Sequence, residues 1–538
     1  MTVKKYILLA TLSGLLLGLS WPTYGWSFLI FFALVPLLYV VVDIHQSTTK
    51  KKGLKVYLLS FWAFFVWNMI STYWLFNASV LGGSIAMIFN TNAYALLMVL
   101  FRWMFVRNTA RATYLFWVVS WLSYEKINLE WELSWPWLTL GNVFAETPHW
   151  VQWYEYTGVF GGSLWILVIN LLIHHFIQAA KDKTVSRFMG VRILLCIALP
   201  IALSLAIYLR VSASNAFAKV VVLQPNIDPY DQKYTSTNVE LLERAKGLSD
   251  NYMQQNPDFV LSPEGYFDEG LGLNLNGYFN DALYRSMVEY AQSHPQTAFL
   301  NGVQAYKIYP RQDKKPTPTA NRARDGRWFD VFNSAMQTQH DQADQFYHKS
   351  KLVPGVEFMP YKQALEPLVG RFLLDFGGTI ATRGIQKNRT VFHNKKNQQT
   401  APMVCYESIY GEFTTGFVRN GAQFLSIITN DAWWGNTEGH RQLLVYAKLR
   451  AIENRRAIAR SANTGISAFI NAKGEIEKSL PYLTSGALMH PVELRNEITF
   501  YATFGDYIPR WAGFFTFILL LLGIRGQKNK KDQLIHTC

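Results

Sequence analysis

The sequence predicts a polytopic α-helical membrane domain of about eight spans joined to an α/β domain. Half of the 538 residues are apolar and 15% are aromatic, which is high for a soluble protein. This excess lies in roughly the first two hundred residues and again just before the C-terminus, whereas the middle has an ordinary globular composition. We therefore expect spans 1 to 7 in residues 1–212, a globular domain in 213–500, and a last span with a tail in 501–538.

The expected spans are apolar runs, and spanning the hydrocarbon layer takes about 20 such residues. They lie near 6–21, 26–42, 56–76, 84–106, 112–124, 157–177, 190–209 and 508–525. The run at 112–124 is short by this measure. Lys4 and Lys5 precede the first run, and the second run follows almost at once without a small-residue cleavage site. A retained anchor is therefore favoured over a cleaved signal peptide.

Basic residues gather at every second connection between these runs. The basic connections hold Lys4 and Lys5, then 50–55, Arg107 with Arg111, 181–192, and finally 525–531. Because positive loops tend to stay in the cytoplasm, both termini are expected there and residues 213–500 are expected outside. The formal net charge is +14, but most basic clusters flank apolar runs. The lipid bilayer, and not nucleic acid, is therefore the expected partner.

The middle of the chain alternates short β-branched runs with helical patterns. Strands are expected at 219–223, 259–261, 298–300, 403–405 and 424–428, and helices at 238–254 and 278–292. This alternation predicts an α/β domain with a mixed or parallel sheet.

Cys405 is the candidate reactive atom of this domain. It ends an apolar run and is one of three cysteines, of which Cys196 lies in an apolar run and Cys538 is the last residue. A disulfide framework or a cysteine-based metal site is therefore not expected. The competing interpretation is a small buried side chain at a strand end, since free cysteine is among the most buried residue types. The sequence also has no histidine cluster suited to a metal and no phosphate-binding Gly-rich motif in a strand-to-helix context.

Glu264 and Lys349 offer the other two groups that nucleophilic catalysis needs. Each lies in a short stretch that follows or interrupts an apolar run, where a strand end is expected. A thiol is mostly protonated near pH 7, so Glu264 could take its proton and Lys349 could stabilise the oxyanion formed by attack on an acyl carbonyl. Alone, each would more often be a surface charge. Their joint occurrence with Cys405 indicates a catalytic site.

The order Glu264, Lys349, Cys405 resembles the Glu-Lys-Cys triad of the nitrilase superfamily, which implies a four-layer αββα sandwich. With its membrane segments, the whole chain resembles the bacterial apolipoprotein N-acyltransferases. The stretches that carry this resemblance are 18–22, 135–138, 224–227, 352–354, 405–407, 430–433, 450–454 and 463–467.

The resemblance implies a role for each residue that matches the family motif. Glu264 would be the general base, Lys349 the oxyanion stabiliser and Cys405 the nucleophile. It further implies supporting or substrate-binding roles for Glu357, Tyr406, Glu407 and Tyr234.

Three positions depart from the family pattern. Lys351 stands where a histidine is usual, which leaves Lys351 open as the working cation. Gly355-Val356-Glu357 replaces Phe-Gly-Glu, and Tyr234 stands where a tryptophan on a substrate-contacting arm is expected.

The implied reaction is a two-step (ping-pong) acyl transfer that needs no metal or organic cofactor. An acyl chain would pass from a membrane phospholipid, through a thioester on Cys405, to the N-terminal amine of diacylglyceryl-cysteine in apolipoproteins, the last step of lipoprotein maturation. The implied location is the outer, periplasmic side of the bacterial inner membrane.

Two other functions remain open. A membrane-tethered nitrilase-like amidase would hydrolyse a small amide. A transporter with an outer ligand-binding domain would carry ionisable residues within its spans, where the sequence has almost none apart from Arg102.

Overall fold

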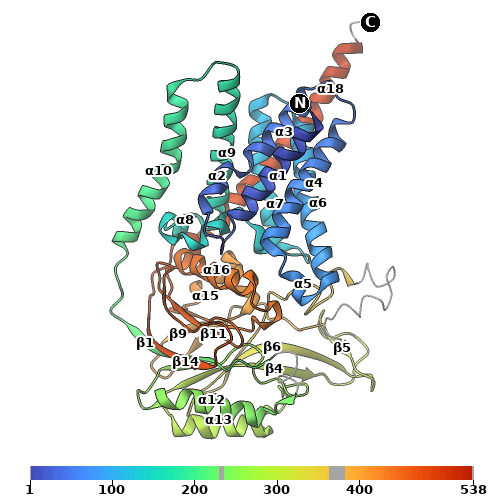
Figure 1. Ribbon diagram of the computed structural model, residues 1–538. Coiled ribbons are helices and arrows are strands. Elements are labelled where there is room, and N and C mark those ends of the chain that lie inside the picture. The colour runs from blue at the N-terminus through green and yellow to red at the C-terminus, as the bar shows by residue number, and fades with distance from the viewer. Residues whose placement is uncertain (1, 229–234, 363–381, 536–538) are drawn as a thin grey trace. The chain divides into compact units, whose positions relative to one another are not determined.

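The computed structural model describes residues 2–228, 235–362 and 382–535, and contacts divide the chain into two compact units (Figure 1). The helical unit comprises Met1–Phe76, Val80–Leu209 and Phe504–Cys538. The α/β unit comprises Asn77–Ser79 and Arg210–Thr503. The helical unit is thus built from both ends of the sequence and the α/β unit mainly from its middle.

The helical unit contains long helices joined by short turns. Its longer helices are α1 (Val3–Leu19), α3 (Val35–Gln46), α4 (Lys52–Thr72), α6 (Val80–Phe105), α7 (Ala110–Glu130), α9 (Val159–Lys181), α10 (Arg187–Arg210) and α18 (Tyr507–Ile535). Shorter helical elements are η1 (Ser27–Leu29), α2 (Ile30–Ala33), α5 (Leu75–Ala78), η2 (Pro136–Leu138), η3 (Leu140–Glu146), η4 (Pro148–Trp150) and α8 (Tyr154–Thr157).

Six helical stretches of the described residues are long and apolar enough to cross a membrane. They are Ser27–Gln46, Lys52–Thr72, Val80–Phe105, Val159–Lys181, Arg187–Arg210 and Tyr507–Arg525. The other two expected spans exist as helices, but α1 has only 17 residues and α7 carries Arg111, Glu125 and Lys126. The helical unit therefore agrees with a polytopic membrane domain, and the figure of about eight spans stays a prediction.

The first sheet of the α/β unit has eight strands, with the order β14-β1-β2-β4-β6-β5, β3 beside β4 and β7 beside β6. Its strands are β1 (Phe217–Gln224), β2 (Phe259–Leu261), β3 (Leu273–Asn274), β4 (Ala298–Ile308), β5 (Asn321–Arg322), β6 (Trp328–Thr338), β7 (Gln345–His348) and β14 (Gly486–Glu493). The central strands β1, β2 and β4 are parallel. All three residues of β2 are buried, as expected for a parallel strand covered on both faces.

The second sheet has six strands in the order β13-β12-β11-β10-β9-β8. Its strands are β8 (Phe392–His393), β9 (Gln399–Val404), β10 (Phe424–Thr429), β11 (Ile458–Ala462), β12 (Ala468–Ile470) and β13 (Ile476–Ser479). The strands β9, β10 and β11 are parallel, so their carboxyl ends meet at one edge of the sheet.

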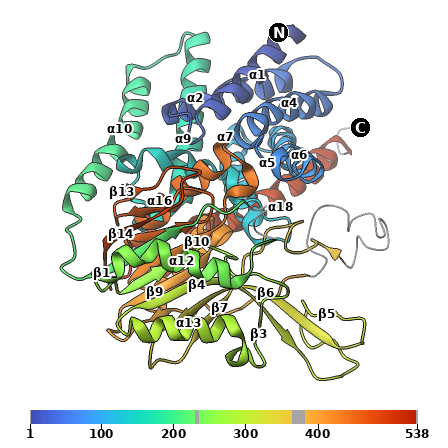
Figure 2. The ribbon, with the colours of Figure 1, turned by 60° about the horizontal axis from the view of Figure 1, so that its bottom comes forward.

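The two sheets pack face to face, and helices cover both outer faces (Figures 1 and 2). Ser461 donates to the carbonyl oxygen of Leu223 across the sheets at 2.7 Å, and the ring centroids of Phe259 and Phe424 lie 5.4 Å apart. The helices α12 (Asn238–Met253) and α13 (Ala282–Ser293) lie on the first sheet, and α15 (Gly411–Arg419) and α16 (Glu438–Asn454) lie on the second. The expected αββα sandwich is confirmed.

Local sequence signals explain where the covering helices begin. Thr237 and Glu240 form a capping box, in which each side chain accepts a hydrogen bond from the backbone N–H of the other, at 3.3 and 2.8 Å. The expected helix at 278–292 begins later, at Ala282, because Asp281 caps it by accepting from Leu283 N at 2.9 Å. Each expected strand has a counterpart: β4 extends well beyond 298–300, whereas the strand expected at 403–405 is β9, which ends at Val404.

Candidate active site

Glu264, Lys349 and Cys405 all lie just beyond the ends of strands. Glu264 follows β2, Lys349 follows β7, and Cys405 follows β9 as the first residue of the short helix η7 (Cys405–Ile409). The first two strands belong to one sheet and β9 to the other. The site is therefore assembled from both sheets of the sandwich.

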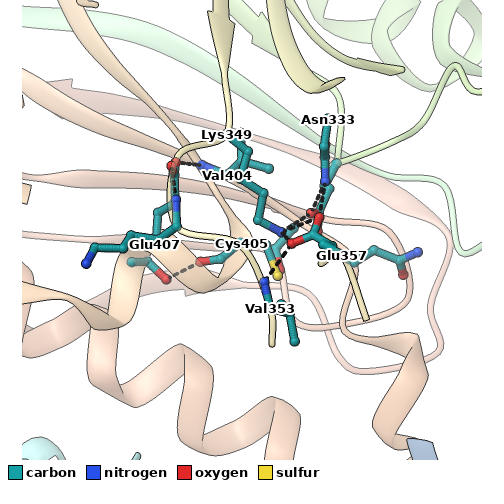
Figure 3. A network of polar contacts seen from close by, with 12 residues as sticks. Asn333, Lys349, Val353, Glu357, Val404, Cys405 and Glu407 are labelled. Carbon is teal, nitrogen blue, oxygen red and sulfur yellow. Dashed lines mark hydrogen bonds and ion pairs between the residues drawn. The ribbon is translucent and has the colours of Figure 1, made fainter. Parts of the chain in front are cut away.

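The Lys349 ammonium lies between two carboxylates. Its Nζ is 2.9 Å from Oε1 of Glu264 and 3.0 Å from Oε2 of Glu357. Lys349 is 1% exposed, so this cation depends on these two residues for the charge compensation that water would otherwise provide. Figure 3 shows Lys349 and Glu357 pointing toward each other, with the Cys405 sulfur beside the end of the Lys349 side chain.

Neutral donors complete the solvation of both carboxylates. Asn333, in β6, donates to Glu264 at 2.7 Å and to Glu357 at 3.1 Å. The backbone N–H of Asn430 donates to Glu264 at 3.2 Å, and that of Val353 donates to Glu357 at 2.9 Å. We call Glu264, Asn333, Lys349 and Glu357 the charged cluster.

The backbone turns sharply at Cys405. Its φ is +50°, in the left-handed region that residues with a Cβ seldom adopt and that is often found at functional sites. The carbonyl oxygen of Cys405 accepts from Ser408 Oγ at 2.7 Å, which holds this turn. The Cys405 side chain hydrogen-bonds to Glu264, so the thiol and its candidate base are in direct contact.

Charge and burial determine the protonation states of these groups. Burial and the negative charge of Glu264 raise the pKa of the Cys405 thiol, although Lys349 opposes this. Burial would raise the pKa of Glu264, but the nearby Lys349 outweighs it and the pKa is lowered. Burial likewise opposes the charged form of Lys349, but Glu264 and Glu357 hold its pKa well above its usual value. The resting site is therefore a neutral thiol beside a carboxylate and an ammonium.

Glu407 connects the loop after β7 to the turn after β9. Its Oε1 accepts from the backbone N–H of Ser350 at 2.6 Å and from the Tyr347 hydroxyl at 2.7 Å, and its Oε2 accepts from Val404 N at 2.9 Å. Burial raises the pKa of Glu407, which these donors oppose. Figure 3 shows Glu407 beside Val404, apart from the Lys349 ammonium. Glu407 thus fixes the backbones that carry Lys349 and Cys405.

The remaining candidate residues lie in different environments. The Lys351 ammonium lies over the ring of Tyr410, 4.7 Å from its centroid, whereas Lys349 contacts the two carboxylates. Tyr406 is 4% exposed and its ring lies 5.3 Å from that of Tyr410. Tyr234 lies outside the described residues.

Asn333 was not among the residues singled out from the sequence. Its two carboxylate partners are 69 and 24 residues away along the chain, so no local pattern marks it. Within the described ranges, no group of three or more His, Cys, Asp or Glu residues could hold a metal ion.

The arrangement is suited to nucleophilic acyl chemistry. A thiol contacts a carboxylate that can take its proton, and a buried ammonium beside them is the kind of group that stabilises an oxyanion. Two family models match the chain: the apolipoprotein N-acyltransferase N-terminal domain over residues 13–172 and the carbon-nitrogen hydrolase over 318–497. The protein is thus a nitrilase-superfamily domain joined to a multi-pass membrane domain.

Relatives similar over nearly the whole chain narrow this class to one family. The apolipoprotein N-acyltransferase of Chlorobaculum tepidum is 28% identical and the alignment covers 94% of each chain. That of Thermotoga maritima is 25% identical, with 97% of this chain and 95% of the relative covered. The chain belongs to the apolipoprotein N-acyltransferase family.

Two solved structures are similar to part of this chain at low sequence identity. An amidase from Nesterenkonia sp. is 16% identical, with 56% of this chain and 98% of the amidase covered and a TM-score of 0.35. Nit3 of Saccharomyces cerevisiae, a member of the nitrilase superfamily, is 12% identical, with 53% of this chain and 92% of that chain covered and a TM-score of 0.36.

Proposed function

We propose that Cys405 carries an acyl group from a membrane phospholipid as a thioester and passes it to the N-terminal amine of diacylglyceryl-cysteine in apolipoproteins. The enzyme is an apolipoprotein N-acyltransferase that acts in lipoprotein maturation. The observation that best supports the assignment of roles is the pairing of Lys349 with Glu264 at 2.9 Å, beside the thiol.

In the first half-reaction the Cys405 thiol gives its proton to Glu264 as the sulfur attacks the ester carbonyl of the phospholipid. Lys349 stabilises the negative oxygen of the tetrahedral intermediate. When the intermediate collapses, the ester C–O bond breaks and the leaving oxygen takes the proton from Glu264. The products are a lysophospholipid and an acyl thioester on Cys405.

In the second half-reaction the acceptor amine attacks the thioester carbonyl and Glu264 accepts a proton from the amine. Lys349 again stabilises the oxyanion, and the C–S bond breaks as the amide forms. The Cys405 sulfur then recovers a proton from Glu264, which restores the resting site. Atoms and charges balance without a metal or an organic cofactor.

The membrane domain holds the enzyme at the bilayer, so that both lipid substrates can react without leaving it. Exposing a lipid chain to water costs about 0.8 kcal/mol per CH₂, so a soluble enzyme would face a large extraction cost. The distribution of basic residues supports an orientation in which the termini are cytoplasmic and the α/β unit faces the periplasm, in the bacterial inner membrane. Tyr406, Glu407 and Tyr234 are proposed to support the site or bind substrate.

Mass spectrometry of the full-length protein incubated with phospholipid alone tests the first half-reaction. We expect one acyl mass on the peptide that contains Cys405, and none in Cys405→Ala. Addition of a diacylglyceryl-cysteine peptide should then remove this mass and produce the N-acylated peptide. Absence of an acyl adduct, together with cleavage of soluble amides, would favour a membrane-tethered amidase and overturn the proposal.

A further inference from the structure

A second chain of buried polar groups reaches Cys405 from its own sheet. Thr429 is the last residue of β10, and β10 pairs with β9 in parallel so that Ile428 lies opposite Val404. This register places Thr429 next to Cys405, with its hydroxyl within hydrogen-bonding reach of the sulfur. Glu264 and Lys349 come from the other sheet. The sulfur therefore contacts groups from both sheets.

The Thr429 hydroxyl is held by a buried ion pair. It donates to Oδ1 of Asp431 at 2.8 Å, and Arg460 donates to Oδ2 of the same carboxylate at 2.7 Å. All three side chains are 0% exposed. Arg460 is itself fixed, because its other terminal nitrogen donates to the carbonyl oxygen of Ile466 at 2.7 Å.

The backbone also makes room for this ion pair. A Cβ at Gly465 would lie 2.6 Å from Oδ2 of Asp431, which is closer than van der Waals contact allows. Any side chain at Gly465 would therefore displace the carboxylate that orients Thr429. Fully buried ion pairs seldom add net stability, so stability alone does not account for this one beside the nucleophile.

We propose that Thr429 donates its hydroxyl hydrogen to the Cys405 sulfur as the thiolate forms, and that Asp431 and Arg460 position this hydroxyl. The hydroxyl has one hydrogen and can rotate. In the resting site the hydroxyl donates this hydrogen to the Asp431 carboxylate. When negative charge develops on the sulfur, the hydroxyl rotates and donates to Cys405 instead. The Asp431 carboxylate then loses its hydrogen bond from Thr429, but Arg460 still compensates its charge.

This role for Thr429 rests on the proposed function, since it serves both half-reactions. The sulfur becomes negative when it loses its proton to Glu264, and again when the C–S bond of the thioester breaks. Lys349 does not stabilise the charged sulfur fully, because its ammonium already pairs with Glu264 and Glu357. Thr429 then makes the additional hydrogen bond to the charged form of the nucleophile, an interaction that is stronger than a bond between neutral groups.

The test is the rate at which iodoacetamide alkylates Cys405 in the full-length protein, followed by mass spectrometry of the Cys405 peptide across a range of pH. Thr429→Val keeps the side-chain shape but removes the donor. We expect alkylation below the thiol pKa to slow roughly tenfold to hundredfold, with the pH dependence displaced upward. The charged groups that face the thiol, namely Glu264, Lys349, Glu357, Asp431 and Arg460, are unchanged in this variant.

Two controls keep the result interpretable. Thr429→Ser retains the hydroxyl and should react within a few times the wild-type rate, and all variants should unfold at similar temperatures. If Thr429→Val does not fold, Thr429→Ala takes its place with the same expectation. The proposal is overturned if the variant without a hydroxyl alkylates like the wild type, or if Thr429→Ser slows as much as Thr429→Val.

The same experiment separates this inference from the proposed function. Alkylation does not require phospholipid. If the wild type takes no acyl group from phospholipid but the valine and serine variants still differ in alkylation, acyl transfer fails and the role of Thr429 stands. If acyl transfer occurs and the two variants alkylate alike, only the role of Thr429 fails.

Discussion

Glu407 is fully buried and Glu264 largely so, but the two carboxylates are surrounded by different partners. Glu264 accepts hydrogen bonds from the Lys349 ammonium and from Asn333. Glu407 accepts only from neutral groups in the contacts described, among them the backbone N–H of Val404. Burial raises the pKa of Glu407, whereas Lys349 outweighs burial and lowers that of Glu264.

The difference shows how one site uses the same side chain for two purposes. An ammonium at 2.9 Å keeps Glu264 ionised and able to accept a proton from Cys405. Neutral N–H donors do less for the charge of Glu407, but they tie it to two backbones at defined positions. We therefore assign proton transfer to Glu264 and positioning to Glu407, and the predictions below test this division.

The largest expected effect comes from removing the cation in Lys349→Met. Two buried carboxylates then lose their compensating charge, which we expect to destabilise the protein by about 3–5 kcal/mol and to slow acyl-enzyme formation by about 10²–10³-fold. Thermal unfolding in detergent and the acyl mass on Cys405 measure the two effects.

Lys246→Met is a matched control, because Lys246 pairs with Glu243 at 2.7 Å on the surface. Surface pairs contribute about 0–1 kcal/mol, so this variant should resemble the wild type. A Lys349→Met protein that is as stable and as active as Lys246→Met would refute the central place of Lys349 in the charged cluster.

A smaller effect is expected for Glu407→Gln. The amide can still accept from Ser350 N on one side, but its NH₂ group then faces the N–H of Val404, which loses its acceptor. Leaving one buried donor unpaired costs about 1–3 kcal/mol. We expect lower stability and slower acyl-enzyme formation, measured as for Lys349→Met. A larger loss of rate than in Glu264→Gln would contradict the division between the two carboxylates.

The pH dependence of acyl-enzyme formation distinguishes the carboxylates without removing either. Because the pKa of Glu264 lies below its ordinary value of about 4.3, the base stays ionised as the pH falls to that value, and the rate should decline only below it. The initial rate of thioester formation from acidic to neutral pH measures this limb.

If the pH–rate curve of the wild type has an inflection between about pH 5 and 7, the Glu407→Gln variant shows which carboxylate causes it. If it disappears in Glu407→Gln, it belongs to Glu407, whose pKa is raised. If it remains, Glu264 titrates there and the interpretation of its environment is wrong.

The sequence was sufficient for the parts of the site that follow local patterns. Glu264, Lys349 and Cys405 each follow a short apolar run that the structure forms as a strand, so their positions at strand ends could be predicted. Their catalytic roles came from the order of the three residues and stay proposals. The strands 259–261 and 424–428 were recognisable for the same reason, since buried parallel strands are continuously apolar.

Contacts between distant strands could not be predicted in this way. Asn333 lies within β6, a strand that was not expected because its apolar and polar residues do not alternate. The pair of Asp431 with Arg460 joins residues that follow or belong to neighbouring strands, 29 positions apart. Nothing in either local stretch specifies its partner, because register and sheet order determine which side chains meet.

The smallest expected effect is that of Tyr347→Phe, which removes one donor from Glu407. Ser350 N and Val404 N still bind the carboxylate, and the ring keeps its contact with Phe417, 5.3 Å away. We expect a stability loss of about 1 kcal/mol and a change in the rate of acyl-enzyme formation below about tenfold, since tenfold corresponds to roughly 1.4 kcal/mol.

Tyr309→Phe is the matched control, because the Tyr309 hydroxyl donates to the buried Asp330 at 2.8 Å. It should cost similar stability without slowing the reaction. If Tyr347→Phe abolishes thioester formation while the protein stays folded, Glu407 and its hydroxyl donor take part in the chemistry itself, and the separation of proton transfer from positioning fails.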